Sequence, residues 1–215
     1  MNKNEKFVIT INRELGSGGR TIGKLLAEKL GVSFYDKALI KELEKKFNLD
    51  KEEIERLKGS KTQWWREFIN AAMYMGQNMN EMWYYQRMTG DEFHLTTTDD
   101  MFKVEKEVLE KLAEEESCVI AGRSGFYVFA NHPNHLSVLI QAPMEHRIER
   151  IMKKQNLSRE EAEKVINKID DMRENYVKRF TGTSRYDTRN YNLVISADGK
   201  TEDQIVDQIL FYIEQ

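Results

Sequence analysis

Residues 7–30 read FVITINRELGSGGRTIGKLLAEKL, and this stretch decides the fold. Its first six residues form a short apolar run rich in β-branched side chains, which is typical of a buried strand. Its last nine residues, 22–30, place isoleucine and leucine side chains on one face at helical spacing. The glycine-rich segment 13–21 therefore joins a strand to a helix.

Glycines in this segment can adopt backbone conformations that other residues avoid, so that successive N–H groups can point at one anion. The anion would also lie at the positive end of the following helix. Phosphate fits this arrangement better than other common ligands. The segment predicts a phosphate-binding loop, and the alternative is a glycine-rich turn without a ligand. The residues of the predicted loop are Gly16, Ser17, Gly18, Gly19, Arg20 and Thr21.

The segment departs from the standard P-loop pattern G-x-x-x-x-G-K-[ST], in which the lysine reaches the β- and γ-phosphates and the hydroxyl holds Mg²⁺. Two registers are possible. We prefer the first, which places Arg20 in the lysine role beside the hydroxyl of Thr21, with Glu14 where the first glycine belongs. In the second register Gly19 takes the lysine position and Arg20 the hydroxyl position. Arginine does not simply replace lysine, because its guanidinium is a planar fork and not a point charge.

Size and composition favour one α/β domain of 215 residues. The net charge of −3 argues against a nucleic-acid carrier or a polybasic membrane surface. Cys118 is the single cysteine, so no internal disulfide forms, and we find neither a signal peptide nor a membrane span. We therefore expect a soluble cytoplasmic protein with small-molecule partners, which can form a homo-oligomer.

Two further residues follow short apolar strands, where ligands bind in open α/β sheets. Asp36 ends the strand predicted at residues 32–35, and it can serve as a ligand-binding acid, as the N-cap of a following helix, or as both. Arg123 lies in the turn after the strand predicted at 117–121, and it is either a phosphate ligand or an ordinary surface arginine.

Residues 37–95 predict a helical insertion, and its segment 63–94 is unusually rich in aromatic residues and methionine. These side chains suit either a buried lid-like insertion or dimer interface, or an acceptor pocket.

The second half alternates strands and helices. The clearest strand is 135–141, and a helix carrying Arg147 follows it. Ser158 and Glu161 form a capping box that starts a long helix, and Asp170, Arg173 and Arg179 are expected off its apolar face. A last strand at 191–196 precedes a helix capped by Thr201 and Gln204. This order predicts a parallel sheet of about five strands with helices on both faces, the fold of P-loop NTPases.

The chain resembles the cytidylate kinase-like family of P-loop nucleoside monophosphate kinases. The resemblance extends over nearly the whole chain, because its motifs occur in the family's order. They are the glycine-rich loop, Tyr35-Asp36, the segment VIAGRSG at 119–125, the strand leading to Arg147, Asp170-x-x-Arg173, and YNLVIS at 191–196.

The resemblance implies transfer of the γ-phosphoryl group of ATP to a nucleoside monophosphate, CMP being the first choice, with Mg²⁺. The loop from Gly16 to Thr21 would bind the donor phosphates, with Thr21 on the metal and Arg147 at the donor base or lid hinge. The acceptor would contact Asp36, Arg123, Asp170 and Arg173. The catalytic residues would be Arg20, Asp36 and Arg173. A lid at 155–190 would contribute the charges of Arg179 and Arg185.

The sequence departs from the family at the P-loop lysine, which is missing, and at Ser124, which stands where cytidylate kinases have an acid. Two other functions therefore stay open: a nucleotide-binding protein without phosphotransfer, and a kinase for another small metabolite.

Overall fold

The computed structural model describes residues 1–36 and 99–215. The chain divides into two compact units, one formed by Met1–Tyr35 with Leu109–Gln215 and the other by Asp36–Val108. The predicted insertion 37–95 and its aromatic segment 63–94 lie outside the described residues. The first unit contains the sheet and the P-loop.

Five parallel strands form one sheet in the order β2-β3-β1-β4-β5. Their bounds are β1 Val8–Arg13, β2 Ser33–Tyr35, β3 Cys118–Ala121, β4 His135–Gln141 and β5 Leu193–Ser196. After β1 the chain crosses to β2 on one side of the sheet, and after β4 it crosses to β5 on the other side. The connections of the neighbouring strands β1 and β4 therefore run in opposite directions, and ligands bind at such a point in open α/β sheets. The predicted fold class is confirmed.

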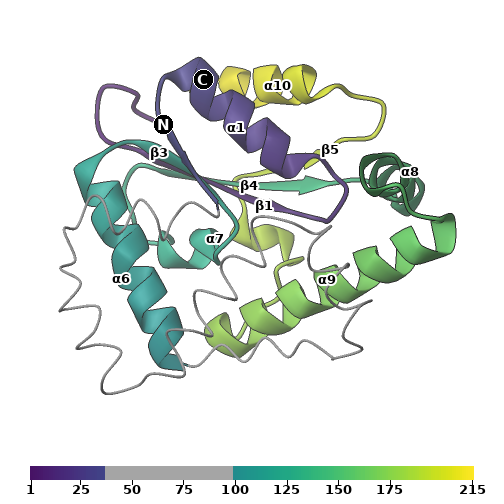
Figure 1. Cartoon of the computed structure of the whole chain (residues 1–215). Coiled ribbons are helices and arrows are strands. Elements are labelled where there is room, and N and C mark those ends of the chain that lie inside the picture. Colours follow the sequence, from purple (N-terminus) through teal and green to yellow (C-terminus); the bar gives the residue numbers. More distant parts are fainter. Residues whose placement is uncertain (37–98) are drawn as a thin grey trace, which may run out of the picture. The chain divides into compact units, whose positions relative to one another are not determined.

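Helices cover both faces of the sheet (Figure 1). On one face, α1 (Gly19–Leu30) and α10 (Glu202–Glu214) pack on the apolar side chains of β1, including Ile9 and Ile11. On the other face, Phe126 of α7 (Gly125–Val128) and Val177 of α9 (Arg159–Thr181) pack against Leu139 of β4. The other helices within residues 1–36 and 99–215 are α6 (Asp99–Glu115), α8 (Met144–Gln155) and a 3₁₀ turn at Thr188–Asn190.

Local signals read from the sequence recur at the helix ends. Both capping boxes form, at Ser158 with Glu161 and at Thr201 with Gln204. Gly31 ends α1 in the left-handed conformation, with φ 67°. The last strand begins two residues later than predicted, because Tyr191 closes the 3₁₀ turn and the Asn192 side chain accepts a hydrogen bond from the main chain of Ser137.

None of the helices in the described ranges is long and apolar enough to cross a membrane.

His135, the first residue of β4, is partly buried against Thr10 and Phe129. Its Nε2 lies 2.8 Å from Oγ1 of Thr10, and its ring packs 5.8 Å from the Phe129 ring. Burial, and then the nearby His132, lower the pKa of His135 from 6.5 to about 4. The imidazole therefore stays neutral in the fold at pH values where the unfolded chain already binds a proton.

We predict that the free energy of unfolding falls by about 1–2 kcal/mol between pH 7 and pH 5 through this group, because only the unfolded state gains the proton there. Urea unfolding of the wild type and of His135→Gln at both pH values measures the effect. The variant keeps a hydrogen-bonding side chain but does not titrate, so its loss of stability over the same range should be smaller. An equal loss in both proteins would contradict the prediction.

Candidate active site

The P-loop joins the carboxyl end of β1 to α1, and two of its glycines have backbone conformations that suit glycine. Gly16 has φ 87°, and Gly18, the N-cap of α1, has φ 82°. A Cβ atom on Gly16 would lie 2.8 Å from the carbonyl oxygen of Arg147, the first turn of α8 being in direct contact with the loop. Gly16 is therefore required by both conformation and space.

Hydrogen bonds hold the loop to the end of β4. Glu14 N–H donates to the carbonyl of Ile140 at 3.1 Å, and the Glu14 carboxylate accepts from Ala142 N–H at 3.0 Å. Buried Ser17 donates its hydroxyl to the Glu14 carbonyl at 2.9 Å. These bonds fix the turn between the strand and the glycines.

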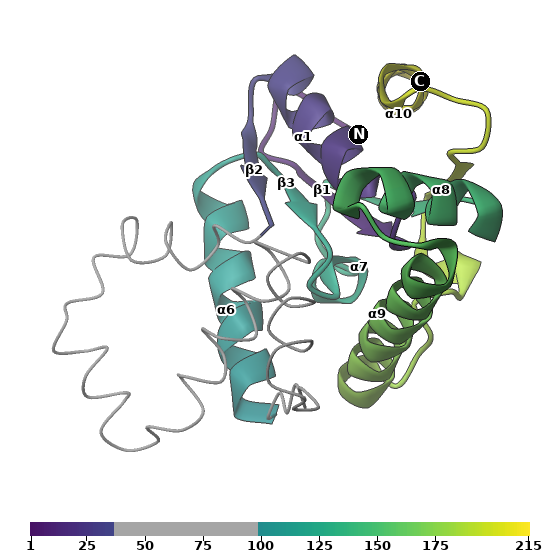
Figure 2. The same cartoon turned by 45° about the vertical axis from the view of Figure 1, so that its right-hand side comes forward.

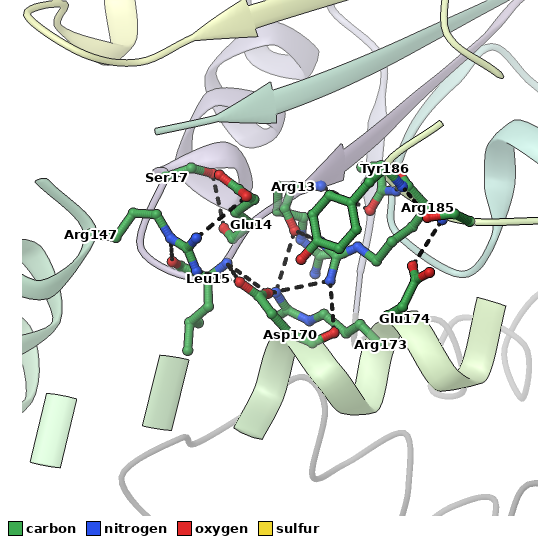
Figure 3. Close-up of polar contacts among 12 residues, drawn as sticks. Arg13, Glu14, Leu15, Ser17, Arg147, Asp170, Arg173, Glu174, Arg185 and Tyr186 are labelled. Atoms are coloured by element: carbon green, nitrogen blue, oxygen red, sulfur yellow. Dashed lines mark hydrogen bonds and ion pairs between the residues drawn. The ribbon is translucent and has the colours of Figure 1, made fainter. Parts of the chain in front are cut away.

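Asp170 of α9 is the central anion of the site (Figure 3). It is 6% exposed, and its Oδ1 accepts a hydrogen bond from Leu15 N–H at 3.1 Å. The same carboxylate forms ion pairs with the guanidinium groups of Arg147, Arg173 and Arg185. One side chain thus connects the loop backbone with three cations.

Arg147 of α8 binds the loop from another side. Its Nε donates to the carbonyl of Leu15 at 2.9 Å, and its Nη1 lies 3.3 Å from Oε1 of Glu14. Helices α8 and α9 lie next to each other (Figure 2), so Arg147 and Asp170 can meet beneath the loop. Leu15 is consequently held at both its N–H and its carbonyl group.

Arg185 and Arg173 both contact the carbonyl group of Arg13, the last residue of β1. Arg185 is completely buried, donates from Nη2 to that carbonyl, and places Nη1 3.3 Å from Oδ1 of Asp170. Nη1 of Arg173 lies 3.4 Å from the same carbonyl and 3.4 Å from Oδ1 of Asp170. Burial, and then the positive charge of Arg185, lower the pKa of Arg173 to about 10, so Arg173 stays charged at neutral pH.

We call the set of contacts around the central carboxylate the arginine cluster. Its members are Glu14, Arg147, Asp170, Arg173 and Arg185. The cluster differs from the sequence-based expectation, which placed Asp170 off the buried face of its helix. Asp170 is buried because guanidinium groups and an amide N–H compensate its charge. Arg185, expected to supply charge from a lid, is likewise buried against the loop backbone.

The other predicted residues lie in several places. Arg20 and Thr21 are exposed on the first turn of α1. Arg123 follows β3 in a left-handed conformation, with φ 58°. Arg179 is exposed on α9, with its guanidinium 5.2 Å from the centre of the Phe180 ring. Asp36 belongs to the second unit, so its position relative to the loop is not described.

Sequence reasoning overlooked Glu14 and Arg13. Glu14 was treated only as a residue at a glycine position, and Arg13 only as the first residue of the glycine-rich segment, without a role. The available signal was their position in the second register of the P-loop, where Arg13 stands in place of the first glycine.

Comparisons with known proteins agree with this fold. The fold and the loop define a P-loop protein. Residues 8–198 match the cytidylate kinase-like family, and the chain belongs to that family. It is therefore a member of a kinase family with the P-loop fold.

Individual relatives are remote. A protein named cytidylate kinase from Sulfolobus acidocaldarius is 22% identical over 209 residues, 96% of this chain and 94% of that protein. An uncharacterized protein from Eubacterium ventriosum has a similar fold, with a TM-score of 0.65, 22% identity and coverage of 97% and 99% of the two chains. A shikimate kinase from Bacteroides thetaiotaomicron gives a TM-score of 0.49 at 17% identity, with coverage of 97% and 99%.

We predict that Asp170→Asn destabilises the protein by about 3 kcal/mol, because it leaves buried guanidinium groups without their shared anion. Asp171→Asn is the matched control, since Asp171 is exposed on the same helix, and it should change stability by less than about 0.5 kcal/mol. Urea unfolding measures both values.

Amide hydrogen exchange adds a local test of the same contact. The Leu15 amide should exchange faster in Asp170→Asn, because an amide oxygen accepts its hydrogen bond more weakly than a carboxylate does. Equal stability and equal Leu15 exchange in the two variants would show that Asp170 does not hold the loop.

Proposed function

We propose that this protein is an ATP-dependent phosphotransferase whose acceptor is a nucleoside monophosphate, with CMP favoured. The observation that carries the proposal is the loop itself: Gly16 and Gly18 in left-handed conformations, directly before the N-terminus of α1, at the carboxyl edge of the sheet. Such a loop presents backbone N–H groups to a phosphate at the positive end of a helix.

In the proposed reaction an acceptor oxygen attacks the γ-phosphorus of ATP. The bond from the γ-phosphorus to the β,γ-bridging oxygen breaks, and ADP leaves with that electron pair. The protein contributes positioning and positive charge, not a covalent intermediate. Gly16 to Gly19 would bind the donor phosphates, whereas Arg123 and Arg173 are the candidates to contact the acceptor.

The arginine cluster suits this role by fixing the loop before the nucleotide binds. A preorganised site does not have to reorder at the moment of reaction, so the free-energy cost of reorganisation is smaller. In this proposal the main role of Asp170, Arg147 and Arg185 is to hold the loop backbone. Direct contacts of Asp170 with the acceptor and of Arg147 with the donor are further parts of the proposal.

Mg²⁺ would arrive bound to the nucleotide and needs few protein ligands. In the first register of the loop, the exposed hydroxyl of Thr21 on the first turn of α1 would be one of them. The described part of the chain contains no group of three or more acidic, histidine or cysteine side chains that could bind a metal alone. The metal would neutralise charge on the β- and γ-phosphates.

A nucleotide-binding protein without phosphotransfer is the second candidate, and the missing P-loop lysine favours it. A kinase for a different small metabolite is the third, and the unusual aromatic and methionine-rich composition of residues 63–94 motivates it.

We predict that the purified protein forms ADP from ATP and Mg²⁺ fastest with CMP in a panel that also contains UMP, dCMP, AMP, GMP and shikimate. ADP release is followed in a coupled assay, with ATP alone as the blank. ATP binding without turnover on any acceptor would favour the second candidate. Turnover only on a non-nucleotide would favour the third.

A glycine pair tests whether the loop is the site of turnover. Gly16→Ala should lower turnover by roughly 10- to 100-fold, because a Cβ there displaces the loop from Arg147. Gly31→Ala is the matched control: its φ is also positive, at 67°, but a Cβ there meets nothing within 4 Å. It carries the same backbone strain, of about 1 kcal/mol, far from the loop. Equal turnover in the two variants would exclude the loop as the donor site.

A further inference from the structure

The side chain of Arg13 occupies the space that a P-loop lysine would need. A Cβ atom on Gly19, the first residue of α1, would lie 2.5 Å from Cβ of Arg13 and 3.0 Å from its Cγ. Contacts this short do not occur between real side chains. A side chain at position 19 would therefore force Arg13 or the backbone around it to shift.

The same two positions form a pair in the standard pattern. When Gly18, the observed N-cap of α1, is taken as the second glycine of G-x-x-x-x-G-K-[ST], the first glycine falls on position 13 and the lysine on position 19. The standard loop has glycine first and the cation seventh, whereas this chain has arginine first and glycine seventh. One cation is present in both arrangements, but it comes from opposite ends of the loop.

The far end of Arg13 reaches the edge where a nucleotide would bind. A Cβ on Gly122 would lie 2.1 Å from Nη1 of Arg13 and 3.3 Å from its Cζ, so the guanidinium lies against the backbone that follows β3. The stem of the side chain crosses Gly19, and its head lies at the carboxyl ends of β1 and β3.

The backbone of Arg13 is also held in place. Its carbonyl group accepts hydrogen bonds from Arg173 and Arg185, and Figure 3 shows Arg13 beside the arginine cluster. Arg20, by contrast, is exposed on the helix surface. A phosphate-binding cation gains most when its position is fixed before the ligand arrives.

We propose that Arg13, and not Arg20, binds the β- and γ-phosphates of the nucleotide in place of the P-loop lysine, which makes the second register the working one. This inference rests on the proposed function, because it assumes that the loop binds ATP. The planar guanidinium can donate two parallel hydrogen bonds to phosphate oxygens, which a lysine at position 19 could not do.

Exchange of the two side chains tests the proposal. Affinity for ATP with Mg²⁺ is measured by calorimetry on five proteins: wild type, Arg13→Gly, Gly19→Lys, the double variant, and Arg13→Lys. We expect Arg13→Gly to bind ATP roughly 10- to 100-fold more weakly, because a charged hydrogen-bond donor is lost. The double variant, which restores the standard pattern, should recover to within about 10-fold of the wild type. Arg13→Lys should fall between the wild type and Arg13→Gly.

Two further variants separate the cations, and thermal unfolding of each variant shows whether it is folded. Arg20→Ala should lose less affinity than Arg13→Gly. Lys24→Ala, which removes another exposed cation of α1, is the control and should leave affinity unchanged. If Gly19→Lys alone fails to fold, this agrees with the clash against Arg13, and the double variant still reports the rescue.

Distinct results would overturn the two proposals. If the wild type binds ATP but Arg13→Gly binds it equally well, or if the double variant binds no better than Arg13→Gly, the role of Arg13 is wrong while the kinase proposal stands. A larger loss in Arg20→Ala than in Arg13→Gly would restore the first register. If the folded wild type does not bind ATP, the proposed function fails, and the role of Arg13 fails with it.

Discussion

The site depends on the contacts of one buried group, the carboxylate of Asp170. A carboxylate that is 6% exposed is costly to bury unless its charge is compensated, and here an amide N–H and three guanidinium groups surround it. The amide belongs to Leu15 in the P-loop. The bonds that compensate the charge of Asp170 therefore also hold the loop in place. Any movement of the loop would leave the carboxylate without part of its shell.

The cluster also explains why distant parts of the chain meet at one strand end. Arg147 comes from α8, Asp170 and Arg173 from α9, and Arg185 from the segment after α9. All four side chains bind the main chain of residues 13–15 directly: Asp170 and Arg147 bind Leu15, and Arg173 and Arg185 bind Arg13. Bonds to main-chain atoms constrain the backbone position of the loop directly.

The crowding of positive charge is consistent with a site for an anion. The pKa of Arg173 is lowered first by burial and then by Arg185, so these two cations are held together against their repulsion. Glu14 and Asp170 offset part of this charge. A triphosphate at the loop would place its negative charge next to these arginine side chains, and phosphoryl transfer requires positive charge around the transferred group.

Periodicity and caps were sufficient for the fold. The order of strands and helices, the two capping boxes and the stop at Gly31 are local properties of the chain, and each predicted element among the described residues forms within about three positions of its expected bounds. The glycine-rich loop was recognisable from the sequence because positive φ angles favour glycine, so the loop conformation is visible in the composition. Burial of Asp170 and Arg185 was not predictable, since isolated charged residues on a helix and in a polar turn read as exposed. Their partners lie far away in sequence, and only the packing of α8 and α9 beneath the loop brings them together. The sequence alone determined a P-loop protein with a missing lysine. Only the tertiary structure decided that a Cβ atom at position 19 would clash with the side chain of Arg13, because the close approach of two backbone positions cannot be read from their order in the chain.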